Sequence, residues 1–171
     1  NLNLKMVIPK QLQNDEFRFL LVKSKDKNPV GGISWSKELL KYNDEILIKW
    51  IENGGNYGVV GGYGNLLIID VDDMRIMELI KKILPSSFYV ITGAGRYHIY
   101  YFYKGGKLKD LNKNNVHWAE MRGLNRFVVA PGSIHPNGNK YEVGKNKDIV
   151  EVTESEIKNF YEKYDREWDK K

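Results

Sequence analysis

An apolar segment that ends in acidic residues, Leu66-Leu-Ile-Ile-Asp-Val-Asp72, constrains the fold of this chain more than any other. Its aliphatic and branched side chains predict a β-strand. Because side chains alternate along a strand, Asp70 and Asp72 are expected to project from the same face, about 7 Å apart. Two carboxylates placed this way at the end of an apolar strand repel each other, and a cation offsets that repulsion.

Two interpretations of these acids are open at the level of the sequence. In the first, Mg²⁺ or Mn²⁺ binds the carboxylate oxygens, and two such ions serve phosphoryl transfer. In the second, the acids are only strand-end and helix-capping residues, favoured by the dipole of the following helix. Asp73 is expected to point away from Asp70 and Asp72 and to cap a helix that begins near Met74.

Two further strands carry candidate site residues. Glu120 lies in the expected strand Val116–Arg122, where it shares a face with Arg122. His98 follows the turn Thr92-Gly-Ala-Gly-Arg-Tyr97, whose glycines let backbone N–H groups approach an anion closely, and His98 itself can donate a hydrogen bond to phosphate. The turn is neither a Walker loop nor a dinucleotide fingerprint. The structural alternatives are a surface glutamate and a buried histidine with one satisfied ring nitrogen.

Arginines and a loop rich in proline and glycine supply the remaining candidates. Arg96 and Arg122 lie in the central region, and arginine makes forked contacts to phosphate that lysine does not make. The loop Pro131–Asn139 carries Ser133 and His135, which we regard as candidate ligand contacts. The alternative is that these loop side chains bond to the backbone of their own loop.

The composition excludes several chemistries. The chain has 171 residues, enough for one domain with a substantial core, and no cysteine, which excludes disulfides, a thiol nucleophile and any zinc–cysteine site. No apolar run is long enough to span a membrane and no signal segment opens the chain, so we expect a cytoplasmic protein with no membrane partner. The net charge is +5, and the basic segment 104–147 suits a polyanion or a solvated lysine-rich surface.

The order of strand and helix patterns predicts an α+β fold. Asn43 is a candidate cap for the second helix, and Thr153 with Glu156 forms a capping box for the last one. Because the chain begins with Asn1, we expect a fragment of a longer protein. Strands are expected at 17–22, 57–61, 66–72, 88–91, 97–103, 118–122, 126–130 and 140–143, and helices at 36–42, 43–53, 74–84 and from 153 onward.

Taken in order, these motifs resemble primase–polymerase (prim-pol) domains of the archaeo-eukaryotic primase superfamily, which occur in replication proteins of archaeal plasmids, viruses and phages. The resemblance rests on Asp70-x-Asp72, the glycine-rich turn that ends in His98, Glu120-Met-Arg-Gly123 and the segment 128–138. The opening stretches 25–35 and 56–61 are also similar to that family. The resemblance covers about residues 17 to 143.

The resemblance implies a two-part α/β body built around an RRM-like antiparallel or mixed sheet. It implies a template-directed DNA primase/polymerase that adds nucleotides from nucleoside triphosphates to a primer on a DNA template, with Mg²⁺ or Mn²⁺ in a two-metal site. By position, Asp70, Asp72 and Glu120 correspond to the acidic metal-binding triad, and His98 corresponds to the triphosphate contact. Further nucleotide contacts are then expected from Arg122, Arg96, Ser133 and His135.

The expected organisation is a single prim-pol domain over residues 1–171, with a C-terminal helix at 153–169 as the possible start of a linker to a helicase domain or partner. Two departures from the family pattern stand out. The chain has Pro131-Gly132 where two prolines are frequent, and its lack of cysteine excludes the zinc stem of some members.

Two other classes of function stay open. A non-catalytic nucleic-acid-binding module would use the basic region and stack bases on the aromatic side chains of the strand 97–103. A metal-dependent glycosyltransferase also uses Asp-x-Asp at a strand end to hold Mn²⁺ and a diphosphate. That reading explains Asp70 and Asp72 but leaves His98, Glu120 and Arg122 without roles.

Overall fold

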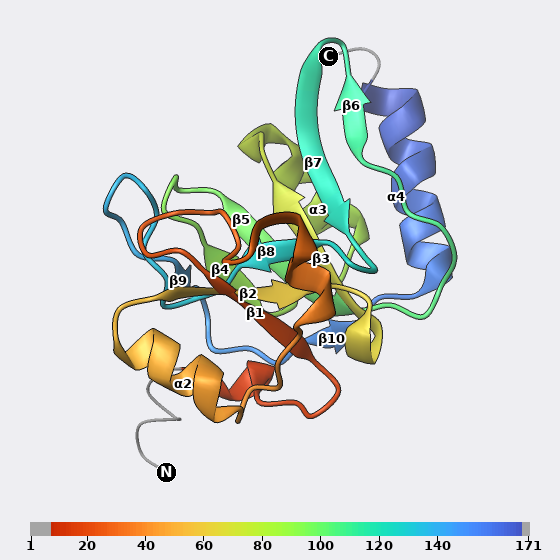
Figure 1. Ribbon diagram of the computed structural model, residues 1–171. Coiled ribbons are helices and arrows are strands. Elements are labelled where there is room, and N and C mark those ends of the chain that lie inside the picture. Colours follow the sequence, from red (N-terminus) through yellow and green to blue (C-terminus); the bar gives the residue numbers. More distant parts are fainter. Residues whose placement is uncertain (1–7, 169–171) are drawn as a thin grey trace.

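The computed structural model describes residues 8–168, which form two β-sheets joined through a shared core (Figure 1). The smaller sheet has the strand order β1-β2-β8, and all of its neighbours are antiparallel. Helix α2 packs against β1 and β2. The elements of this part are η1 (Lys10–Leu12), β1 (Arg18–Val22), η2 (Gly32–Lys37), α2 (Glu45–Glu52), β2 (Asn56–Val60), η3 (Tyr63–Asn65) and β8 (Phe127–Val129), where η denotes a 3₁₀ helix.

The larger sheet has the strand order β6-β7-β3-β5-β4-β9. A further short strand, β10, pairs with residues 101–102 of β5, past the residues that pair with β4. Every neighbouring pair is antiparallel except β10 with β5, which is parallel. Two helices, α3 and α4, pack on one face of this sheet. The bounds are β3 (Leu66–Val71), η4 (Met74–Ile76), α3 (Met77–Ile83), β4 (Tyr89–Ile91), β5 (Tyr97–Phe102), β6 (Leu111–Lys113), β7 (Val116–Arg122), β9 (Glu142–Val143), β10 (Val150–Glu151) and α4 (Glu154–Glu167).

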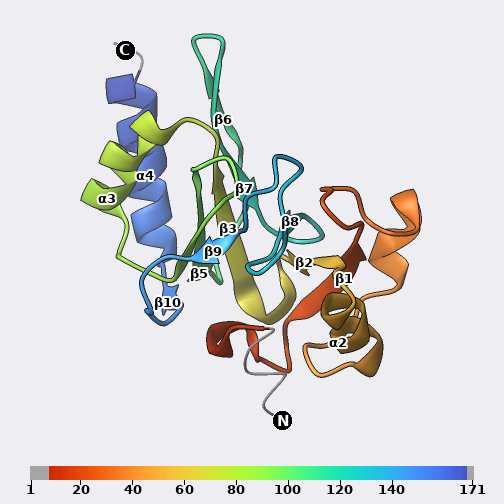
Figure 2. The ribbon, with the colours of Figure 1, turned by 90° about the vertical axis from the view of Figure 1, so that its left-hand side faces the viewer.

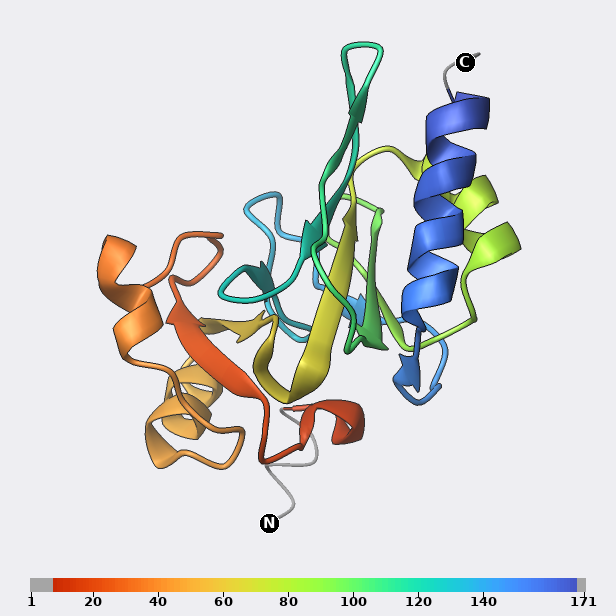
Figure 3. The same ribbon diagram turned by 90° about the vertical axis from the view of Figure 1, so that its right-hand side faces the viewer.

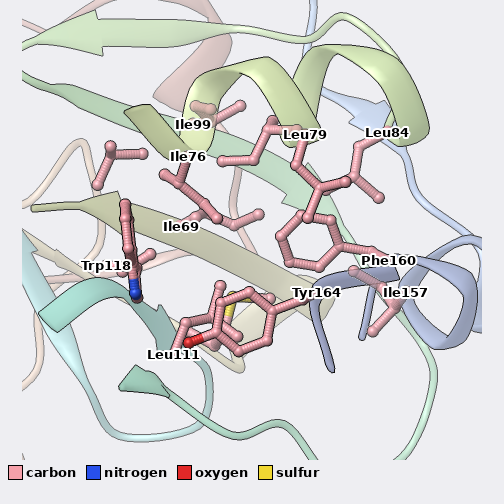
Figure 4. Close-up of a cluster of buried hydrophobic side chains, with 14 of the residues drawn as sticks. Ile69, Ile76, Leu79, Leu84, Ile99, Leu111, Trp118, Ile157, Phe160 and Tyr164 are labelled. Carbon is pink, nitrogen blue, oxygen red and sulfur yellow. The ribbon is translucent and has the colours of Figure 1, made fainter. Parts of the chain in front are cut away.

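Alternate side chains of β3 supply two separate cores. Leu67 and Ile69 pack with α3 and α4, whereas Leu66 and Ile68 pack toward the smaller sheet. Figure 3 shows the larger sheet lying between the smaller sheet and the two helices. The core beneath the helices is drawn in Figure 4, where Phe160 of α4 lies among aliphatic side chains from α3 and the sheet. The apolar strand of the sequence is thus buried on both faces.

The β6–β7 hairpin projects from the body beyond the end of the larger sheet (Figures 2 and 3). Its two-residue turn is Asn114-Asn115, with φ of 56° and 60°. Positive φ at both positions is the geometry of a type I′ turn, which asparagine tolerates better than most residues. Leu111 pairs with Ala119 and Asn112 pairs with His117, so one residue of β7, Trp118, bulges out of the pairing.

The expected α+β class is confirmed by these helices and the mostly antiparallel sheets, whereas the RRM-like description stays a prediction. Asp73 accepts from the backbone N–H of Arg75, as expected of a cap. The capping box of Thr153 and Glu156 is also confirmed; residue 169, the expected end of α4, lies outside the described residues. The cap of α2 is Asp44 rather than Asn43. Within residues 8–168 we find no helix that could span a bilayer.

Candidate active site

The acids singled out in the sequence meet on the face of the larger sheet that turns toward the smaller sheet. Asp70 of β3 is in register with Glu120 of β7 on one side and with His98 of β5 on the other. Residues directly opposite each other on antiparallel strands have adjacent side chains. A row of Glu120, Asp70 and His98 therefore crosses the sheet, and all three line a cavity of about 270 Å³ together with Asp72.

Asp70 lies between a histidine and an arginine. Nε2 of His98 is 3.2 Å from Oδ1, and Nη2 of Arg122 is 3.6 Å from Oδ2. Burial by itself raises the pKa of Asp70, but the hydrogen bond and charge of His98 and the charge of Arg122 outweigh it, so the pKa is lowered. Asp70 is therefore a carboxylate at neutral pH, with the hard oxygen donors that Mg²⁺ and Mn²⁺ prefer.

Asp72 has the opposite electrostatic balance. Burial, followed by the charges of Asp70 and Glu120, raises its pKa against the opposing charge of His117. Its Oδ2 atom is buried and lies 2.9 Å from Nε2 of His117, but the two groups are not aligned as a hydrogen bond. Like charges held close together make the ionised form of Asp72 costly, and a cation placed beside it offsets that cost.

Glu120 lies in the middle of a chain of ion pairs, between two arginines. Its Oε1 is 2.8 Å from Nη2 of Arg122, and its Oε2 is 2.9 Å from Nη2 of Arg126. Arg126 also makes a forked contact with Asp110, at 2.8 and 3.0 Å. The Arg126 guanidinium and the backbone N–H of Met121 lower the pKa of Asp110 despite its burial. Asp110 therefore anchors Arg126, a link that the sequence did not indicate.

Basic groups line the rest of the cavity. Arg96 is exposed at its rim and makes no ion pair within the described residues. Nδ1 of His135 accepts from the backbone N–H of Asn137 at 3.0 Å, so Nε2 carries the proton of the neutral ring. Burial and the charge of Lys27 lower the pKa of His135, which favours that neutral form. Lys27 also lines the cavity, and it lies in the stretch 25–35 that already resembled the family.

The glycine-rich turn is bound to the loop that carries His135. A side chain at Gly93 would place its Cβ 2.1 Å from Cβ of His135, so only glycine fits there. The side-chain amides of Asn137 and Asn139 both donate to the carbonyl of Gly93, at 2.9 and 3.0 Å. The close approach that this glycine permits is thus to a neighbouring loop, and it brings His135 to the cavity that His98 lines.

Ser133 lies outside the cavity lining. Its buried hydroxyl accepts from the backbone N–H of Tyr57 at 3.2 Å and lies 3.4 Å from the carbonyl of the same residue. The side-chain amide of Asn56 makes two hydrogen bonds to the backbone of Ile134, the residue after Ser133. Its oxygen accepts from the Ile134 N–H at 2.9 Å, and its nitrogen donates to the Ile134 carbonyl at 2.7 Å. Ser133 thus bonds to the backbone of β2, whereas the alternative expected a bond within its own loop; His135, whose Nδ1 accepts from a backbone N–H of that loop, makes such a bond.

His117 is the site residue that sequence reasoning missed. One ligand atom from each of Asp72, His117 and Glu120 lies within 4.8 Å of the others, so the three form a potential metal-binding cluster. Regular alternation places His117 and Glu120 on opposite faces of β7, because they are three residues apart. The bulge at Trp118 reverses that alternation and turns His117 to the face that carries Glu120.

An α+β domain in which carboxylates face basic side chains across one cavity is suited to bind metal ions and phosphate groups. Over residues 9–156 the chain matches the Prim-Pol family, described as bifunctional DNA primase/polymerase, N-terminal. Because that match covers most of the chain, the protein belongs to the Prim-Pol family, whose general role is DNA priming and polymerisation and which is metal-dependent in general. No curated protein matches the chain.

Proposed function

We propose that this domain is a template-directed nucleotidyltransferase that adds nucleotides from nucleoside triphosphates to the 3′-hydroxyl of a primer during replicon DNA replication. One observation carries the proposal: Asp70, Asp72 and Glu120 line the same cavity as five basic side chains that can donate hydrogen bonds. Carboxylates and phosphate-binding groups facing one cavity are what phosphoryl transfer needs. The donors are Lys27, Arg96, His98, Arg122 and His135.

The acidic side of the cavity fits divalent ions. Asp70 and Asp72 offer oxygens from one strand and its end, and Glu120 offers one from the neighbouring strand. The orphaned Oδ2 of Asp72 and the mutual repulsion of the three carboxylates both favour a cation. Asp70, Asp72 and Glu120 would hold Mg²⁺ or Mn²⁺, and such ions supply charge neutralisation for the phosphates and activation of the attacking hydroxyl.

The basic side of the cavity binds and orients the triphosphate in this proposal. Arg96 has no ion pair to give up within the described residues, so its guanidinium is available for a forked phosphate contact. His135 offers Nε2–H as a neutral donor. Arg122 and His98 contact Glu120 and Asp70, and they would be available to phosphate oxygens if those acids held a metal ion. Ser133 contributes indirectly, by fixing the loop that carries His135.

Primer extension tests this proposal directly. The chain is incubated with a primed DNA template, deoxynucleoside or ribonucleoside triphosphates, and Mg²⁺ or Mn²⁺. We expect template-directed extension that is lost in Asp70→Asn and Asp72→Asn but retained in Asp73→Asn. Asp73 is the matched control, because it caps the next helix and pairs with Arg75 instead of lining the cavity. Extension that survives in Asp70→Asn and Asp72→Asn would remove the acids from the mechanism.

The same assay separates the rival functions. Folded protein that binds primed DNA in a salt-sensitive manner but extends nothing with either metal would favour the non-catalytic nucleic-acid-binding module. The glycosyltransferase alternative gives no role to His98, Glu120 and Arg122, although all three line the cavity with the two aspartates. A helicase domain or partner, and a cytoplasmic, replicon-associated setting, complete the proposal; co-purification of a helicase with the full-length protein tests the partner.

A further inference from the structure

The His117 side chain lies between two of the proposed metal-binding acids. Its Nε2 atom is 2.9 Å from Oδ2 of Asp72 and 3.7 Å from Oε1 of Glu120. The resemblance to prim-pol domains implies a triad of carboxylates and assigns nothing to this position. About two fifths of the His117 side chain is exposed, and it lies beside Asp72 and Glu120 without itself lining the cavity.

The other ring nitrogen of His117 is also engaged. Nδ1 contacts Oδ1 of Asn112, the residue paired with His117 across the β6–β7 hairpin. A carbonyl oxygen only accepts, so Nδ1 must carry a hydrogen, and the neutral ring then has its lone pair on Nε2. A carbonyl that fixes the tautomer in this way is the usual second partner of a metal-binding histidine.

This arrangement directs a lone pair at two carboxylates. A positive charge is needed between Nε2 and Asp72, and either a proton on Nε2 or a metal ion supplies it; Glu120 already pairs with Arg122 and Arg126. Ligands at about 2.1 Å from one octahedral ion are about 3.0 Å apart when adjacent. The 2.9 Å between His117 and Asp72 matches that spacing, whereas the 3.7 Å between His117 and Glu120 is longer. Glu120 would have to turn its Oε1 away from Arg122 to complete the set.

We propose that His117 is a nitrogen ligand of the metal centre and makes the Asp72–His117–Glu120 cluster selective for Mn²⁺ over Mg²⁺. Imidazole suits first-row transition metals, whereas Mg²⁺ prefers oxygen ligands and keeps its waters. The inference rests on the proposed function for the identity of the two acids. It adds a ligand and a metal preference that three carboxylates alone do not supply.

Mn²⁺ binding to this chain tests the ligand without relying on catalysis. Bound Mn²⁺ is titrated by electron paramagnetic resonance, and spin-echo modulation reports any ¹⁴N atom coordinated directly. We expect an imidazole ¹⁴N signal in the wild type and its loss in His117→Gln. The Kd for Mn²⁺ should rise at least about tenfold in that variant, while the Kd for Mg²⁺, measured by competition, changes far less.

Two variants separate coordination from general disturbance. His135→Gln removes an imidazole that lines the cavity, yet it should keep both the ¹⁴N signal and the Mn²⁺ affinity. Asn112→Ala removes only the carbonyl that fixes the His117 ring, so it should keep the signal and weaken Mn²⁺ by roughly tenfold. Circular dichroism confirms that each variant is folded.

The outcomes distinguish this inference from the proposed function. Bound Mn²⁺ with no ¹⁴N signal, or unchanged Mn²⁺ affinity in His117→Gln, overturns the inference and leaves the polymerase proposal intact if extension still needs Asp70. A ¹⁴N signal in a protein that extends no primer supports the ligand and removes the polymerase activity. A folded wild type that binds no Mn²⁺ overturns the inference outright.

Discussion

Neighbouring residues of β3 point to opposite faces of the larger sheet, one into the core beneath the helices and the other into the candidate site. Ile69 points toward α3 and α4 and is fully buried among apolar side chains (Figure 4). Asp70, the next residue, points into a cavity lined by charged groups. A larger cavity of about 350 Å³ lies on the helix side, between α3 and the β4–β5 hairpin, and no carboxylate lines it. Cavity size therefore does not identify the candidate site here.

The difference between the faces shows how the strand meets two requirements, the stability of the fold and the placement of charged side chains. The helix face supplies apolar burial, which stabilises the fold by roughly 25 cal/mol per Å². The other face also buries Leu66 and Ile68. At its end, however, burial and the charges of Asp70 and Glu120 raise the pKa of Asp72, which makes the ionised form of Asp72 costly on folding. One strand can serve both purposes because its side chains alternate, so the rigid apolar side fixes the position of the charged side.

The largest expected effect comes from exchanging the chemistry of the two faces. Ile69→Asp buries a carboxylate without a partner, which costs several kcal/mol and approaches the whole stability of a typical domain. We expect that variant to be unfolded by circular dichroism at 25 °C. Asp70→Ile changes the adjacent residue on the other face and should fold but lose primer extension. A cooperative thermal transition in Ile69→Asp close to that of the wild type would contradict the division.

A second contrast uses two adjacent acids, Asp72 and Asp73. Asp72→Asn removes a ligand and should lower primer extension by more than about 100-fold. It also removes repulsion from Asp70 and Glu120, so the free energy of unfolding should be equal or higher. Asp73→Asn weakens a helix cap and its fork to Arg75, so it should cost up to about 1 kcal/mol and leave extension unchanged. Urea unfolding and extension rates, measured together, test whether the two effects have opposite signs.

Much of this division was predictable from the sequence. The run from Leu66 to Asp72 predicted the strand, and alternation placed Asp70 on the face that bears the site. The caps at Asp73 and Thr153 followed from local side-chain chemistry. Short-range patterns succeed in these cases because each depends on a few neighbouring residues.

The features that local patterns did not indicate depend on pairing between distant parts of the chain. No sequence pattern indicated a role for His117. Regular alternation from Glu120 would place it on the helix face, and the bulge that turns it arises from its pairing with β6. Lys27 and Asp110 reach the site or its supports from loops far away in the sequence. Ser133 was expected to contact nucleotide, but its partner is the backbone of β2, which becomes its neighbour only after folding.

A third prediction sharpens the comparison within the charged face. Arg96 lines the cavity without an ion pair in the described part of the chain, so Arg96→Ala should raise the KM for nucleoside triphosphate about tenfold with little change in kcat. Arg75→Ala is the matched control, since that arginine is also exposed but binds Asp73 outside the cavity. Steady-state kinetics at several salt concentrations measure both. Equal KM values for the two variants would place the triphosphate elsewhere.

The smallest expected effect concerns the supports of the charged face. The lowered pKa of Asp110 means that its carboxylate stabilises the fold above the unfolded-state pKa of about 4, and that this stabilisation is lost as the pH falls through the folded value. Asp110→Asn should therefore lower the free energy of unfolding by about 1 kcal/mol at pH 7, because the pair is partly exposed and screened. The difference from the wild type should shrink as the pH falls below about 4.

Urea unfolding of both proteins between pH 2 and pH 8 measures that difference. The helix face provides the control, because Ile69→Val removes one buried methylene and should cost roughly 1 kcal/mol at every pH. A pH-dependent loss in Asp110→Asn beside a constant loss in Ile69→Val would show that the charged face is stabilised by ionisation and the apolar face by packing. A constant loss in both would mean that the Asp110–Arg126 contact acts through its shape alone.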